Sequence, residues 1–269
     1  MNDASASDAA RSAKNSTALQ VLARLGFAVN GLVHLLIGAL AIGIATGGGQ
    51  TDADQSGAFR QLASTPGGVF LLWAVVIGMF ALGLWLLISA FLMQPQDSKR
   101  KWARRGAEAA KGVTYFALGS TALTFALGGS SDSSSSTSSL TGELMGNPIG
   151  IAVLVVAGLA VMGVGGFFIY KGATRKFTED ISVPGGTVRK AVLGLGFAGY
   201  IAKGIAIGVV GILVIAAAFT HDPEKSSGLD AALTSLTELP FGVVVLIVIA
   251  IGLIAYGVYC FIRARYARL

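Results

Sequence analysis

The sequence is short of charged residues: Asp, Glu, Lys and Arg together make up 13% of its 269 residues. Soluble globular domains usually contain about 25% charged residues. Hydrophobic residues instead make up 54% of the chain. The composition therefore excludes a soluble globular domain and indicates a protein that crosses a membrane several times.

Cysteine and histidine are also scarce. The single Cys260 excludes an intramolecular disulfide and any metal cluster built from cysteines. The two histidines, His34 and His221, fall in an apolar stretch and in a polar connection, respectively. A haem held by two histidines in the membrane would need both of them there. We therefore expect no metal, haem or other cofactor.

The familiar signatures of enzymes are missing as well. No helix carries a pair of carboxylates, no serine has a histidine and an acid nearby, and no glycine-rich phosphate loop joins a strand to a helix. The 37 glycines fit close helix packing in lipid, where small residues let backbones approach one another. The sequence thus predicts a protein that is not an enzyme.

Six apolar stretches are each long enough to cross about 30 Å of hydrocarbon, which takes roughly 18 residues or more of helix. They predict an all-α, polytopic membrane protein with six transmembrane helices. The stretches lie near residues 24–46, 67–93, 106–128, 148–171, 192–219 and 241–263.

The basic residues predict the orientation. All but two of the 20 Lys and Arg residues lie in the termini, in every second connection or in the helix ends beside them; the exceptions are Arg60 and Lys225. By the positive-inside rule, both termini should be cytoplasmic in a multi-pass protein of the bacterial cell membrane. We expect the basic side to face a bilayer with an anionic cytoplasmic leaflet, and we expect no nucleic-acid partner.

The polar N-terminal segment, residues 1–20, is rich in Ala, Ser and Asp. It contains no short apolar core followed by a small-residue cleavage site, so we expect no signal peptide there. Its composition is typical of a disordered cytoplasmic tail.

A two-helix hairpin occurs three times, in residues 21–95, 103–175 and 191–269. Each copy opens with a glycine, six residues and a second glycine, and its second helix begins with Pro-x-Gly. Repeats with an even number of crossings share one orientation, which predicts a pseudo-threefold axis along the membrane normal. The glycine pairs are Gly31 and Gly38, Gly112 and Gly119, and Gly204 and Gly211; the Pro-x-Gly motifs begin at Pro66, Pro148 and Pro240.

The return helices and the external connections repeat too. Gly83, Gly165 and Gly257 each lie 17 residues after the proline of their repeat. Apolar pairs at i, i+4 spacing in the external connections predict short amphipathic helices on the membrane surface. Before the second of these pairs, residues 131–139 are nearly all Ser and Thr, which predicts a flexible, solvated insertion.

The segment Ala23-Arg24-Leu25-Gly26-Phe27-Ala28, followed by the first glycine pair and by Pro66-Gly67-Gly68, resembles the repeat unit of the domain of unknown function 1206 family. Members of this family are bacterial membrane proteins with three such two-helix units. The second repeat departs from the unit at Ala103-Arg104-Arg105-Gly106, and the third lacks the arginine before Gly196-Phe197. The resemblance implies the fold and the location, and it implies no activity.

In each repeat a polar residue immediately precedes the first glycine of the pair: Asn30, Lys111 and Lys203. They should lie at one level, about 9 Å into the membrane from the cytoplasmic side. Ionisable residues within a membrane suggest a functional site. Alternatively, both lysines can extend back to water, since helical side chains tilt towards the N-terminus. Glu108 lies three residues before Lys111 and can pair with it.

His34 lies one helical turn deeper than Asn30. A neutral histidine that is hydrogen-bonded to a neighbouring helix is the expected role, and a proton-relay or gating role is the alternative. Asn30, His34, Lys111 and Lys203 are therefore the candidates for a polar cavity on the cytoplasmic side.

Two classes of function remain open. The first is a non-catalytic scaffold or accessory subunit that belongs to a membrane protein complex, which the lack of a converging catalytic site favours. The second is a conduit or transporter for a small solute or ion, lined by the four polar candidates. The direction of those side chains, towards a common interior or towards lipid and headgroups, separates the two.

Overall fold

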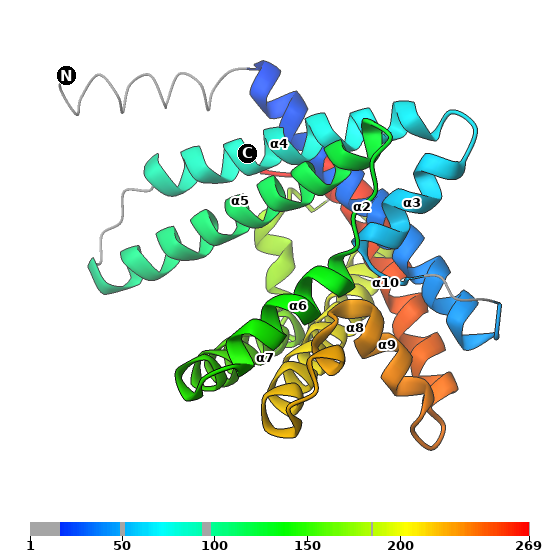
Figure 1. Ribbon diagram of the computed structural model, residues 1–269. Coiled ribbons are helices and arrows are strands. Elements are labelled where there is room, and N and C mark those ends of the chain that lie inside the picture. Colours follow the sequence, from blue (N-terminus) through cyan, green and yellow to red (C-terminus); the bar gives the residue numbers. More distant parts are fainter. Residues whose placement is uncertain (1–16, 49–51, 93–97, 184, 269) are drawn as a thin grey trace.

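The computed structural model describes residues 17–48, 52–92, 98–183 and 185–268, and its regular elements are helices (Figure 1). The long helices are α2 (Thr17–Ala45), α4 (Gly68–Leu92), α5 (Ser98–Ala126), α7 (Pro148–Ala173), α8 (Gly186–Thr220) and α10 (Gly242–Tyr266). The short ones are α3 (Gln55–Ser64), α6 (Ser133–Met145), η1 (Lys176–Asp180), η2 (Pro223–Ser226) and α9 (Leu229–Thr237). The prediction of an all-α fold is confirmed.

Five of the described helices, α2, α4, α7, α8 and α10, are long and apolar enough to cross a membrane. The chain is thus a helical, multi-pass membrane protein. Helix α5 is not among these five, because Lys111 and several Ser and Thr residues make it less apolar. Helix α2 already begins at Thr17, so residues 17–20 are helical and the prediction of a disordered tail is wrong there. The rest of that predicted tail lies outside the described residues.

The second helix of each repeat packs along the first helix of another repeat: α4 along α5, α7 along α8, and α10 along α2. Within the repeats, α2 also packs against α4, and α8 packs against α10. Helices α5 and α7 form no comparable contact over their described residues, and Figure 1 draws them well apart. The second hairpin is therefore open, whereas the first and third are closed.

Glycines lie where the helices of different repeats cross. A Cβ atom added at Gly31 would lie 2.7 Å from the carbonyl oxygen of Gly257, and one at Gly204 would lie 2.6 Å from that of Gly165. At Gly112 it would lie 3.1 Å from the carbonyl oxygen of Gly83. Real Cβ atoms almost never approach backbone oxygens as closely as the first two, so these crossings depend on glycine.

The connection between the two helices of each repeat folds back on the start of the second helix. In each repeat the glycine of Pro-x-Gly lies against the backbone carbonyl of the leucine six residues earlier, at a distance that leaves no room for a side chain. The pairs are Gly68 with Leu62, Gly150 with Leu144, and Gly242 with Leu236. The connections contain the helices α3, α6 and α9, as predicted. Helices α3 and α9 bury one apolar face, whereas α6 exposes Leu140 and buries Thr141, so its predicted amphipathic character is wrong.

The serine-rich stretch is not flexible, because most of it forms α6. The Asp132 carboxylate accepts hydrogen bonds from the backbone N–H groups of Ser134 and Ser135, at 2.9 and 3.1 Å, and so caps the helix. The hydroxyl of Thr137 donates to the backbone carbonyl of Ser133 at 2.7 Å. A strong N-cap thus overrides the weak helix propensity of serine, which the composition alone did not reveal.

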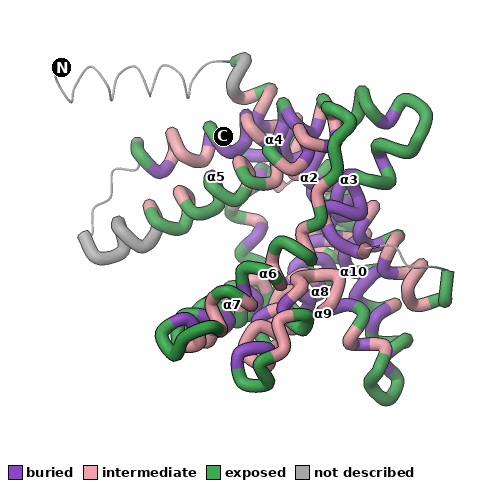
Figure 2. Tube along the Cα trace, in the orientation of Figure 1, coloured by how far each residue is buried: buried purple, intermediate pink, exposed green. Residues whose placement is uncertain are grey.

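The segments that connect the two helices of each repeat are joined to one another in a closed ring. The Ser56 hydroxyl of α3 contacts the Ser133 hydroxyl of α6. The Ser226 hydroxyl of η2 donates to the Thr141 hydroxyl of α6 at 2.8 Å. The ring closes where the Ala53 N–H donates to the Asp230 carboxylate at 2.8 Å. The core lies beneath α3 and α9, and Figure 2 shows it as buried segments of α2, α4 and α10.

Candidate functional site

The polar residues of α2 are buried against α10. The Asn30 amide Nδ2 donates to the Cys260 Sγ at 3.4 Å. The His34 Nδ1 lies 2.8 Å from the Asn30 backbone oxygen and must donate its hydrogen there, because a carbonyl only accepts. The imidazole also packs on the Tyr256 ring, with 4.7 Å between ring centroids. His34 is thus hydrogen-bonded to its own helix, rather than to a neighbouring helix as expected.

Lys203 reaches into the same region from α8. Its ammonium lies 4.3 Å from the ring centroid of Tyr256 on α10 and 5.2 Å from that of Phe168 on α7. No hydrogen bond or ion pair of this ammonium is found within the described part of the chain. The Lys203 ammonium is therefore attracted to the faces of two aromatic rings, and such cation–π attraction is stronger when the cation is away from water.

Lys111 does not join this group. Its ammonium pairs with the Glu108 carboxylate at 2.7 Å on the same face of α5, as the sequence predicted, and half of its side chain is exposed. The structure thus brings together Asn30, His34 and Lys203, and it leaves Lys111 at the surface of α5. The three repeat-equivalent positions do not form one symmetric polar site, because the open second hairpin turns α5 away.

A cluster of aromatic residues lies beside Lys203, and sequence reasoning missed it. Tyr200 packs on Tyr256, with 5.2 Å between centroids, and stacks on Phe177 at 5.4 Å. The Tyr259 hydroxyl donates to the Phe177 carbonyl oxygen at 3.2 Å. Phe177 belongs to η1, in the connection between α7 and α8. The heptad-like spacing of the tyrosines along α10 was visible in the sequence, but the position of Phe177 over them was not.

The same connection carries Asp180, a second residue that was missed. Its carboxylate lies 2.6 Å from the Lys171 ammonium of α7 and 3.5 Å from the Arg263 guanidinium of α10. The Arg263 guanidinium also covers the Phe27 ring at 4.4 Å. Backbone bonds around Ile181 and Ala267 fasten the connection to the end of α10. Asp180 therefore ties α7 to α10 on the basic side of the protein.

The charges of this region are unbalanced. Lys171, Lys203 and Arg263 are three cations, and Asp180 is the carboxylate that pairs with two of them. Lys203 and Arg263 also lie within electrostatic reach of one another. We call these four residues with the aromatic cluster the cationic site. Its excess positive charge suits an anion.

Carboxylates gather at the opposite end, beside α3 and α9. Burial raises the pKa of Asp54, and the nearby carboxylates of Asp52 and Asp230 raise it further. Burial also raises the pKa of Asp230. Asp132 is exposed, and its hydrogen bonds from Ser135 lower its pKa. In residues 17–48, 52–92, 98–183 and 185–268, no three acidic, His or Cys side chains are grouped as a metal site would need.

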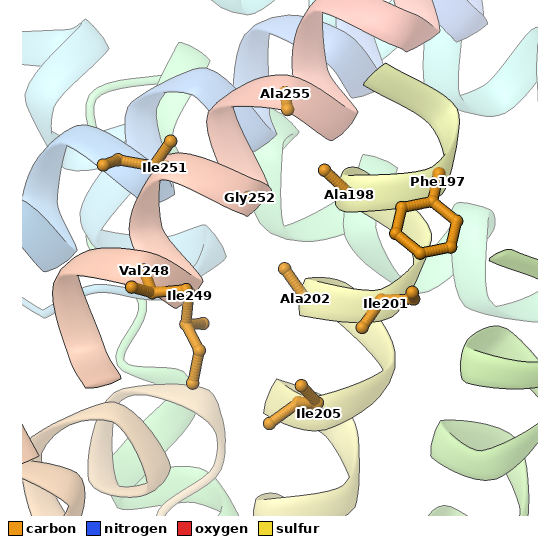
Figure 3. Close-up of a pocket in the computed structure, with 10 residues that line it drawn as sticks. All are labelled: Phe197, Ala198, Ile201, Ala202, Ile205, Val248, Ile249, Ile251, Gly252 and Ala255. Carbon is orange, nitrogen blue, oxygen red and sulfur yellow. The ribbon is translucent and has the colours of Figure 1, made fainter. Parts of the chain in front are cut away.

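A pocket lies between α8 and α10, and its lining includes none of the residues of the cationic site (Figure 3). It is a groove of about 300 Å³ lined by aliphatic side chains, Phe197 and a glycine. Small residues such as Ala198, Ala202 and Gly252 form its floor, and Phe197 lies at its edge (Figure 3). It carries no polar candidate, as expected of a groove that faces lipid tails.

The comparisons with known proteins agree with the repeat pattern. The family described as Domain of Unknown Function (DUF1206) matches the chain in three segments, residues 25–92, 108–175 and 198–267. The chain belongs to this family. It is also 30% identical over 251 residues to the "Uncharacterized protein YxxB" of Bacillus subtilis (strain 168), which covers 90% of this chain and 89% of the relative. No solved structure matches the chain.

Proposed function

We propose that α5 is a sixth membrane-crossing helix. It runs along α4, which is apolar enough to cross, with Gly112 against Gly83 and Gly119 against Phe80. A helix that packs along a spanning helix over this length lies at the same depth. The hydroxyls of Thr114, Ser120, Thr121 and Thr124 each donate to the backbone carbonyl one turn earlier in the helix. Lipid can therefore surround it.

The six helices then form three hairpins of one orientation around an axis along the membrane normal. The recurrence of the glycine crossings supports this arrangement, because each joins the return helix of one repeat to the first helix of another. Both termini are cytoplasmic on the distribution of basic residues, and the membrane is that of a bacterial cell. Reactivity of single cysteines tests this topology: Ser135→Cys should react with an impermeant external reagent, and Ser98→Cys and Ser5→Cys should not.

Within this topology, the protein is a non-catalytic scaffold or accessory subunit of a membrane protein complex. The observation that carries this proposal is the engagement of the polar candidates: Asn30 bonds Cys260, His34 bonds its own helix, and Lys111 pairs with Glu108. Such contacts fix helix packing and occupy the polar groups of these three residues.

A small-solute conduit is the second candidate. One observation favours it: Lys203 is held among aromatic rings beside Asn30 and His34, on the inner side of α8. A cation in that position could bind an anionic solute that enters from the cytoplasm.

Affinity purification of the tagged full chain from native membranes, followed by mass spectrometry, separates the two candidates. A membrane protein that co-purifies in constant ratio, and that is absent from an untagged control, is expected for the scaffold. A chain that purifies alone, and that admits anions into proteoliposomes in a manner dependent on Lys203, would overturn the scaffold in favour of the conduit.

A further inference from the structure

The closed first hairpin depends on two glycines at the crossing of its helices. A Cβ atom at Gly26 on α2 would lie 2.5 Å from the carbonyl oxygen of Gly78 on α4. Gly26 lies five residues before Gly31, and Gly78 lies five residues before Gly83. The equivalent positions in the other repeats are therefore those that lie five residues before the glycines at the crossings between repeats.

The closed third hairpin uses glycine at the same two places. Gly199 lies against the backbone of Tyr256 on α10, where a Cβ atom would be 2.6 Å from the Tyr256 Cα. Gly252 lies against Ala202 on α8, with no room for a side chain. Two of the three hairpins thus close through the same pair of glycine positions.

In the second hairpin these two places are Ala107 and Ala160, and both are exposed. Each alanine adds a methyl group where the other repeats bring backbones together, so the same close crossing cannot form. This agrees with the separation of α5 from α7 (Figure 1). We call the interval between these two helices the open seam.

The α7 wall of the open seam is apolar, whereas the α5 wall is made of small residues, with Thr114 exposed one turn beyond Ala110. Val164 and Phe167 on α7 lie four and seven residues beyond Ala160, on its helical face, and both are about half exposed. On α5, Ala110 follows Ala107 by three residues and is exposed too. Water would wet the α7 wall at a cost, whereas hydrocarbon chains would cover it.

The basic end of the open seam is cationic. Lys111 on α5 and Lys171 on α7 lie within electrostatic reach of one another across it. Lys203 lies over Phe168, which faces it from α7. With Arg263, these four cations are balanced by the two carboxylates of Glu108 and Asp180, so a net charge of about +2 remains in a region of low dielectric.

We propose that the open seam binds an anionic phospholipid, whose acyl chains lie between α5 and α7 and whose phosphate lies near Lys111 and Lys171, with the Lys203 ammonium of α8 adding positive charge at the inner side of the seam. The apolar α7 wall and the excess positive charge at one end match the two parts of such a molecule. A second copy of the chain would bring the same cations to the same seam, and like charges repel there. The inference depends on the proposed crossing of α5, which cysteine labelling tests separately from lipid binding.

The test measures the melting temperature of the full chain in a mild nonionic detergent by tryptophan fluorescence. The probes are dioleoylphosphatidylglycerol, dioleoylphosphatidylcholine with the same chains, and inorganic phosphate. We expect the anionic lipid to raise the melting temperature by about 3 °C or more at saturation and the other two to have little effect. An equal effect of phosphatidylcholine, or of phosphate alone, would overturn the proposal.

Four variants locate the effect. Ala160→Trp fills the open seam, and Lys203→Gln removes one cation; each should lose at least half of the stabilisation by phosphatidylglycerol. Leu159→Trp is the matched control for the first, since it is exposed at the same depth on α7. Lys225→Gln, at an exposed external ion pair, is the control for the second. If Ala160→Trp and Lys203→Gln keep the full stabilisation by phosphatidylglycerol, the proposal fails. It also fails if native mass spectrometry shows that the lipid changes only the proportion of monomer and dimer and does not remain bound to the monomer.

Discussion

Gly31 and Gly257 approach each other through their backbones: a Cβ atom added at either glycine would lie 2.7 Å from the carbonyl oxygen of the other. The contact joins α2 to α10, which are the first and last long helices of the described chain. It is therefore the crossing that closes the bundle between its third and first repeats.

Replacement of Gly31 by alanine should destabilise the protein. The methyl group would meet the Gly257 carbonyl oxygen and the Phe261 ring, and overpacking of this kind costs about 1–3 kcal/mol. Thermal unfolding of the purified chain measures the loss. Gly163→Ala on α7 is the control, because nothing lies within 4 Å of its added Cβ. A melting temperature that is unchanged in Gly31→Ala would show that the helices do not meet there.

Removal of the Asp180 charge should also destabilise the protein. Asp180→Asn leaves the partly buried Lys171 and Arg263 without their shared carboxylate, and breaking a buried pair from one side costs about 3 kcal/mol. The neighbouring Glu179 is exposed, so Glu179→Gln should change the free energy of unfolding very little. Equal melting temperatures for the two variants would contradict the role assigned to Asp180.

Stability should rise as the pH falls towards about 4, because of Asp54 and Asp230. Their folded-state pKa values are raised above the ordinary 3.8, so the folded protein holds more protons than the unfolded chain. The stability that they contribute is complete below 3.8 and is lost as the pH rises through their raised values. Asp132, whose pKa is lowered, acts in the opposite direction only below 3.8.

The measurement compares melting temperatures between pH 7 and pH 4.5 for the wild type and for the double variant Asp54→Asn, Asp230→Asn. Both asparagines keep an oxygen that can accept the hydrogen bonds from Gly57 and Ala53. The wild type should gain more than the variant as the pH falls. Identical pH profiles would show that these two carboxylates do not titrate differently on unfolding.

Phe241→Gly should stabilise the protein in detergent by about 1 kcal/mol. Phe241 has a φ of 62°, a left-handed conformation that costs an L-residue about 1–2 kcal/mol, and its side chain is 85% exposed. The equivalent position in the first repeat is already glycine, Gly67, with a φ of 79°. The reverse change, Gly67→Phe, should lower the melting temperature, and a stabilised Gly67→Phe would refute the argument.

The sequence was sufficient for the helices and their order. The return helices α4, α7 and α10 begin within one residue of the predicted stretches, because Pro-x-Gly motifs mark their starts. The first helices of the repeats, α2, α5 and α8, begin six to eight residues earlier than predicted, because their first turns are polar. The glycine pairs were also read correctly as packing positions. These features depend on spacing along the chain, which is what a sequence records directly.

The candidate site was less predictable. Equivalent sequence positions suggested that Asn30, Lys111 and Lys203 share one level, yet Lys111 lies apart because two alanines replace glycines in the second hairpin. Phe177 and Asp180 reach the cationic site from a connection whose fold depends on tertiary contacts. Helix α6 was missed because the composition of residues 131–139 predicts a flexible segment. The hydrogen bonds that the Asp132 side chain accepts at the start of the helix favour the helical structure instead.

Because α10 packs on α2, the three repeats form a ring, and the ring can keep its contacts even if the chain begins and ends at a different repeat. The guanidinium of Arg24, near the start of α2, donates to the carbonyl oxygen of Ala264, near the end of α10, at 3.3 Å. A short linker could therefore join the two ends of the described chain, and new termini could be placed between α4 and α5. Such a circular permutant would keep every interhelical crossing, so the bundle should tolerate permutation as ring-shaped repeat proteins do.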